Sequence, residues 1–132
     1  DSSTSRGLGD VYKRQLDDIN AFQYYNQDPL DMNKYQQQAS TTAIYDKKHA
    51  VIYPALGLAA EAGEVANKVK KIMRDGDFDR EAVADEIGDC LWYIAALCRD
   101  LNVDMENVAY SNLDKLHSRQ KRGTLRGNGD NR

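Results

Sequence analysis

The chain has 132 residues, a formal net charge of −3 at pH 7 and a pI of about 5.3. That length suits a single domain with a modest core, and an acidic chain lacks the basic field with which proteins hold nucleic acid backbones. The longest apolar runs have about ten residues, whereas a membrane-spanning helix requires about 20. We therefore expect neither a nucleic acid nor a membrane partner.

Residues 1–15 differ in composition from the rest of the chain. They contain Ser, Gly and Arg without an apolar period, which predicts disorder. The stretch GLGDVYKRQ resembles translated adapter sequence, so we interpret residues 1–15 as a non-native leader, with a native flexible arm as the alternative. Residues 16–130 are then expected to form the domain.

Helical signals dominate the domain, and no strand-like alternation is present. Pro29 ends a possible short helix in residues 16–30, and Asp31 is a suitable N-cap for a first helix that reaches Tyr45. Further helices are expected over residues 54–74, 79–100 and about 104–120, with a turn at residues 75–77 and a loop from residue 122 onward. The pattern predicts an all-α fold, a bundle of four to five helices.

The two cysteines, Cys90 and Cys98, fall on one predicted helix. Eight residues of helix separate them by about 12 Å, which is too far for a disulfide. Together with the lack of a visible secretory signal, this favours a reducing, cytoplasmic environment.

Two pairs of acidic residues lie on successive predicted helices: Glu61 with Glu64, and Glu86 with Asp89. Each pair has i, i+3 spacing, so both acids share a helix face. The midpoints of the two pairs are equally distant from Asp75, in the predicted turn. If the two helices form a central antiparallel hairpin, the pairs meet at the same level.

The apolar pattern predicts that all four carboxylates point to the same side of this hairpin. Each acid precedes an apolar position expected to face the neighbouring helix: Ala62, Val65, Ile87 and Cys90. Four convergent carboxylates repel one another, and oxygen ligands select hard cations, so the pattern indicates a site for Mg²⁺ or Mn²⁺. The alternative is a solvated acidic face, in which Glu64 pairs with Lys68.

A basic stripe follows on the last predicted helix. Asn112, Lys115 and Arg119 share one face, and these side chains suit phosphate oxygens. From spacing alone, however, an ordinary surface stripe is the favoured interpretation. Trp92 and Tyr93 follow the second acid pair and are expected to pack in the core, with a base or a neighbouring subunit as the alternative contact.

Several of these stretches resemble one protein family. LGLAAEAGEVANKVKK followed by DEIGDCLWYIAAL resembles the MazG-like nucleotide pyrophosphohydrolases of the all-α NTP pyrophosphatase superfamily, which carry a Glu-x-x-Glu pair followed by a Glu-x-x-Asp pair. KYQQQASTTAIY resembles the first helix of that family and NLDKLHSRQKRG the fourth. The resemblance covers about residues 31–130. It departs at Ala60, where some members carry a further Glu, so it leaves the subgroup undefined.

The resemblance implies a function and a set of roles. The reaction is Mg²⁺-dependent hydrolysis of a (deoxy)nucleoside triphosphate to the monophosphate and pyrophosphate, as in the removal of damaged nucleotides. Glu61, Glu64, Glu86 and Asp89 would hold the metal, and Asn112, Lys115 and Arg119 would contact phosphate. The family also implies a homodimer or homotetramer with the active site near a subunit interface.

Two other functions stay open. The first is a related pyrophosphatase, of the dUTPase-like or phosphoribosyl-ATP type, with the same metal chemistry and a different base pocket. The second is a non-catalytic helical interaction module, which would bind no metal and would tolerate loss of Glu86.

Overall fold

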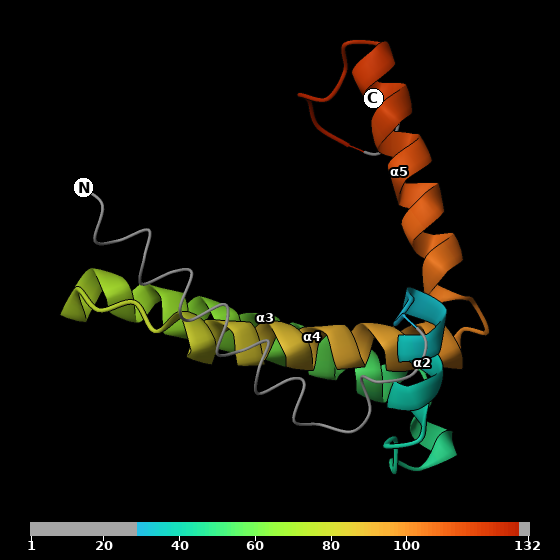
Figure 1. Ribbon diagram of the computed structural model, residues 1–132, viewed down its shortest axis with the longest axis horizontal. Helices are drawn as coiled ribbons and strands as arrows, with labels where there is room; N and C mark the ends of the chain where they lie inside the picture. Colours follow the sequence, from blue (N-terminus) through green and yellow to red (C-terminus); the bar gives the residue numbers. More distant parts are fainter. Residues whose placement is uncertain (1–28, 130–132) are drawn as a thin grey trace. The chain divides into compact units, whose positions relative to one another are not determined.

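The computed structural model describes residues 29–129, which contain helices and no strand. The helices are α2 (Met32–Ser40), the 3-10 helix η1 (Lys47–His49), α3 (Ile52–Asp75), α4 (Arg80–Asp100) and α5 (Met105–Lys121) (Figure 1). The predicted all-α class is therefore confirmed for this part of the chain. The predicted leader lies outside the described residues, as does the predicted short helix apart from residues 29 and 30, which are not helical. In the described part of the chain, every helix is too short or too polar to cross a membrane.

Helix α2 ends at Ser40, earlier than the predicted end at Tyr45. Here three hydroxyl side chains bond to carbonyls of the last turn: Ser40 to Gln36 O, Thr41 to Gln38 O and Thr42 to Ala39 O, each at 2.7 Å. Hydroxyl groups that bond to nearby backbone compete with helix continuation. The chain then turns and forms η1 before the start of α3.

Helices α3 and α4 pack along each other and run in opposite directions (Figure 1). Gly76 ends α3 with a positive φ of 77°, and its N–H donates to Ile72 O at 2.8 Å, an arrangement that glycine adopts without a steric penalty. Asp79 begins α4 as an N-cap and accepts from the N–H of Ala82 at 2.9 Å. Both ends of the short connection are thus set by local sequence.

The buried core of the described residues lies where α2, α4 and α5 meet. Ala95, Cys98 and Met105 are buried, and Tyr35, Ala39 and Ile94 pack against them. The amide of Gln36 donates to Val103 O at 2.9 Å and accepts from the N–H of Met105 at 2.8 Å. A buried amide with both ends bonded fixes α2 against the start of α5.

The start of α3 contains a strained turn. Val51 has φ 68° and ψ −53°, and Ile52 N–H donates to Ala50 O at 2.8 Å, which is a γ-turn. A β-branched residue with positive φ is an outlier, and such a conformation costs about 1–3 kcal/mol. The surrounding structure must therefore hold Val51 in place.

The carboxylate of Asp100, at the end of α4, provides that restraint. Its Oδ2 accepts from the N–H of Val51 at 2.9 Å and from the hydroxyl of Tyr45 at 2.7 Å. Arg99 donates to Oδ1 of Asp100 at 2.9 Å and to the Tyr45 oxygen at 2.7 Å. Burial alone would raise the pKa of Asp100, but the hydrogen bonds from Tyr45, Val51 and Arg99 outweigh it and lower that pKa.

We predict that Asp100→Asn lowers the free energy of unfolding by about 2–3 kcal/mol, because hydrogen bonds to a charged, nearly buried acceptor are weakened together. Urea denaturation measures this loss, and hydrogen exchange at the Val51 amide should accelerate. Asp75→Asn is the matched control, because its ion pair with Arg74 is exposed to solvent. Equal effects of the two substitutions would contradict the role given to Asp100.

Candidate metal centre

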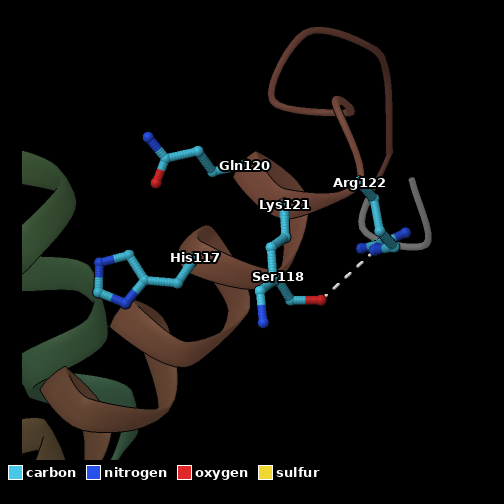
Figure 2. Close-up of a pocket in the computed structure, with 5 residues that line it drawn as sticks. All are labelled: His117, Ser118, Gln120, Lys121 and Arg122. Carbon is cyan, nitrogen blue, oxygen red and sulfur yellow. Dashed lines mark hydrogen bonds between the residues drawn. The ribbon is translucent and has the colours of Figure 1, made fainter.

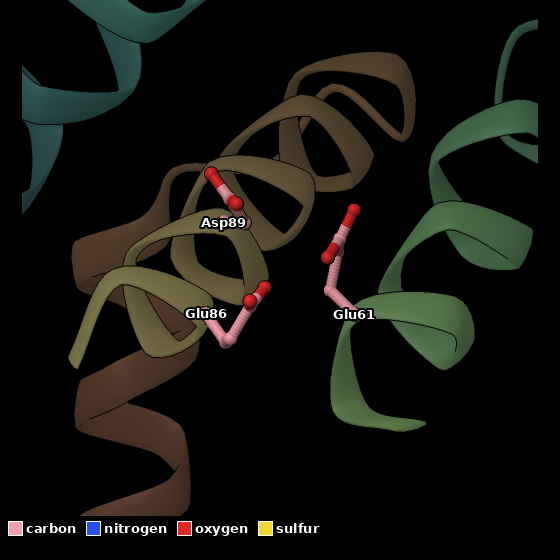
Figure 3. A group of neighbouring side chains, drawn as sticks. All are labelled: Glu61, Glu86 and Asp89. Carbon is pink, nitrogen blue, oxygen red and sulfur yellow. The ribbon is translucent and has the colours of Figure 1, made fainter. Parts of the chain in front are cut away.

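Three carboxylates from two helices meet on the α3/α4 pair. Glu61 projects from α3 toward Glu86 and Asp89 of α4 (Figure 3). Each of the three offers an oxygen atom that lies within 4.8 Å of the others. Glu61 and Glu86 are half-buried and Asp89 is exposed, so the cluster lies at the edge of the helix pair and is open on one side.

Glu64, the fourth predicted ligand, does not belong to this group. Three residues along a helix correspond to a rotation of about 300°, so Glu64 is offset from Glu61 by about 60° around the axis. Its side chain is exposed and accepts a hydrogen bond from Asn67 Nδ2 at 3.5 Å. Spacing placed both acids on one face, but Glu61 is the one with an oxygen within 4.8 Å of Glu86 and Asp89 oxygens.

The ion pair of the cluster is made by Lys68, for which the sequence offered Glu64 only as an alternative partner. Lys68 Nζ lies 3.3 Å from Glu86 Oε1, whereas i, i+4 spacing suggested a pair with Glu64 on the same helix. Lys68 follows Glu61 by two helical turns, so the two side chains lie on the same side of α3. The seven-residue spacing between Glu61 and Lys68 was therefore the sequence signal that Lys68 lies near the carboxylate cluster.

Electrostatics at the cluster favour a cation. Burial, followed by the charges of Asp89, Glu86 and Glu64, raises the pKa of Glu61. Three carboxylates and one ammonium leave an excess of negative charge, which favours the binding of a cation. The donors are all oxygen, and this set suits Mg²⁺ or Mn²⁺ rather than a soft metal.

An aromatic group borders the cluster. A Cβ atom at Gly57 would collide with the ring of Tyr93, so the ring of Tyr93 lies directly on the backbone of α3. Burial, the neighbouring Tyr53 and then the charges of Glu61 and Asp89 raise the pKa of Tyr93, which agrees with a position beside the carboxylates.

Trp92 meets Tyr93 edge to face, with ring centroids 5.0 Å apart, and donates from Nε1 to Thr42 Oγ1 at 2.7 Å. Both aromatic residues are half-buried at the α3/α4 surface rather than part of the central core. The expectation that they pack in the core is thus wrong, because the neighbouring buried residues of α4, Ala95 and Cys98, pack with α2 and the start of α5 instead.

The predicted phosphate contacts lie elsewhere on the chain. Asn112 and Lys115 are exposed on α5, and Arg119 is buried, with 5% exposure. Helix α5 packs on α2 and α4 and leads away from the α3/α4 pair (Figure 1). The structure of one chain therefore does not bring these three residues to the carboxylates, and their role stays a prediction.

A separate basic depression of about 610 Å³ lies at the end of α5 (Figure 2). Its lining residues are His117, Ser118, Gln120, Lys121 and Arg122, and Arg122 Nε donates to Ser118 Oγ at 3.4 Å. It contains none of the three predicted phosphate contacts and no carboxylate, so it is not the metal centre.

Comparison with known proteins agrees with the all-helical fold. Residues 53–124 match the model of the MazG nucleotide pyrophosphohydrolase domain, a range that includes all of the predicted site residues. The chain is also similar to the Gene 37 protein of Mycobacterium phage L5, with 46% identity over 114 residues that cover 78% of this chain and 100% of the phage protein. No solved structure matches the chain significantly.

The chain belongs to the MazG nucleotide pyrophosphohydrolase family. Membership supports an enzyme of the nucleotide pyrophosphohydrolase type. That family generally uses a divalent metal, and the Glu61, Glu86 and Asp89 cluster is the candidate place for it. The name of the phage relative adds nothing about activity.

We predict that Glu61→Gln raises the melting temperature in the presence of a chelator, because it relieves repulsion at the cluster. Glu61 has a raised pKa in the folded protein, so its ionisation opposes folding as the pH rises above its ordinary value of 4.5. The gain should therefore be present at neutral pH and vanish below about pH 4.5. Thermal melts across this range measure it. Asp85→Asn, on the exposed side of α4, is the control, and an equal gain there would indicate a general charge effect.

Proposed function

We propose that this protein hydrolyses (deoxy)nucleoside triphosphates to the monophosphate and pyrophosphate in a Mg²⁺-dependent reaction, for which Mn²⁺ can substitute. The observation that carries the proposal is the meeting of Glu61, Glu86 and Asp89 across two helices. Family membership supports the reaction class. Removal of damaged nucleotides from the cellular pool is the physiological role that we propose for it.

The residues of the cluster have distinct tasks in this proposal. Glu61, Glu86 and Asp89 hold the cation, and Glu64 completes the predicted set. When bound there, a divalent cation supplies Lewis-acid polarisation of a phosphate group. A carboxylate oxygen that is not engaged with the cation accepts the proton of the attacking water. Asn112, Lys115 and Arg119 stabilise negative charge on the departing pyrophosphate.

We predict that pyrophosphate release from a panel of nucleoside triphosphates requires Mg²⁺ and falls at least about a hundredfold in Glu86→Gln. The panel includes dUTP and phosphoribosyl-ATP, so its ranking separates the related pyrophosphatases. Asp85→Asn, one residue away and outside the cluster, serves as the control. Circular dichroism checks that the variant is folded. Absence of release from every nucleotide, with no Mg²⁺ binding by the folded protein, would favour the non-catalytic interaction module.

The proposal includes a homodimer or homotetramer in which the α3/α4 pair is the central hairpin. Large apolar side chains are exposed along several helices; among them are Leu56, Ile87, Val108, Leu113 and Leu116. Such a surface supports association. In the proposed assembly, α5 of one copy supplies Lys115 and its neighbours to the carboxylates of another, because α5 leads away from the carboxylates of its own chain (Figure 1).

We predict intersubunit complementation between Glu86→Gln and Lys115→Ala. In a symmetric dimer, each mixed pair carries one site that has both native residues. Equimolar refolding of the two impaired variants should therefore restore about a quarter of wild-type turnover, and light scattering should give the mass of two or four chains. A single-chain mass would contradict the assembly, and a dimer without recovery would place Lys115 at the site of its own chain.

A further inference from the structure

Lys68 occupies a position that the proposed function does not explain. Its ammonium lies 3.3 Å from Glu86, a carboxylate of the candidate metal centre. The pair bridges α3 and α4, and its two side chains are only partly exposed, 34% for Lys68 and 16% for Glu86. Among the ion pairs of the described residues, this is the one that involves the carboxylate cluster.

The charges in the cluster favour such a cation when no metal is bound. Three carboxylates with oxygens within 4.8 Å of one another repel strongly, and Lys68 is the cation that the structure places in contact with them. A divalent ion at the same oxygens would satisfy Glu86 and repel the ammonium. Lys68 and the metal thus compete for one carboxylate.

Displacement of Lys68 from Glu86 would leave its charge close to the substrate. A lysine has a flexible stem of four carbons and three donors, so its head can move by several ångströms without a change in the helix. A polyphosphate bound to the metal is the nearest new acceptor, and an ammonium is a common phosphate ligand.

We propose that Lys68 serves the site in two states: it is the counter-ion of Glu86 before metal binds, and it contacts the phosphates of the nucleotide after metal has taken Glu86. This inference rests on the proposed function. It assigns to α3 a phosphate contact from the same chain as the carboxylates, in addition to those predicted on α5.

The test is a pair of measurements on full-length Lys68→Met. Mn²⁺ affinity without nucleotide, measured by electron paramagnetic resonance, should increase about three- to tenfold, because a competing charge is removed. The KM for the metal–nucleotide complex should rise about tenfold, because a charged hydrogen bond is lost. A tighter metal site with a weaker substrate site is a combination that general destabilisation does not produce.

Two further variants control for the charge of residue 68 and for the loss of a lysine elsewhere on α3. Lys68→Arg retains the cation and should keep Mn²⁺ affinity near the wild-type value. Lys70→Met removes the same charge two residues away at an exposed position and should change Mn²⁺ affinity much less.

The outcomes separate this inference from the function on which it rests. Wild-type protein that binds Mn²⁺ and turns over nucleotide, with Mn²⁺ affinity unchanged in Lys68→Met, would overturn the competition. An unchanged KM would overturn the phosphate contact. Wild-type protein without Mn²⁺ binding would overturn both the inference and the proposed metal centre.

Discussion

The carboxylate of Asp100 is the constraint on which the geometry of the α3/α4 pair depends. It lies at the end of α4 and holds the strained Val51 turn at the beginning of α3, while Gly76 closes the opposite end of the pair. With both ends fixed, the helices cannot slide by a turn relative to each other. Glu61 meets Glu86 and Asp89 in this register, so a residue far from the cluster helps to stabilise the arrangement in which the cluster forms.

The same helix pair combines opposing electrostatic demands. Asp100 is stabilised as an anion by donors from three residues, whereas Glu61 lies among other acids and has a raised pKa. A carboxylate with hydrogen-bond donors stabilises the folded structure, whereas carboxylates that repel one another favour the binding of a cation. The fold places the carboxylate with three donors at the end of the helix pair and the mutually repelling carboxylates along its edge, where Asp89 is exposed to solvent.

Much of the helical fold could be predicted from the sequence because its signals are local. Gly76 and Asp79 mark the connection between α3 and α4, and the i, i+3 acid pairs predict which faces carry carboxylates. Side-chain direction across helices is not local. Glu64 therefore lies outside the carboxylate cluster to which Glu61 belongs. Likewise, Lys68 pairs with Glu86, although i, i+4 spacing offered Glu64 as its partner. The Val51–Asp100 contact joins residues 49 positions apart and left no periodic signal, and burial of Arg119 likewise depends on tertiary packing.

The contact between Gly57 and Tyr93 couples the sizes of the residues that fit at these two positions. Because the aromatic ring fills the space that a side chain at position 57 would need, a larger residue there would force the ring of Tyr93 to move. A larger residue at position 57 combined with a smaller one at position 93 would avoid that collision. Covariation of these two positions among homologues would thus record the close approach of α3 and α4, and divergence at the pair would mark lineages in which the surface beside the carboxylates has been reshaped.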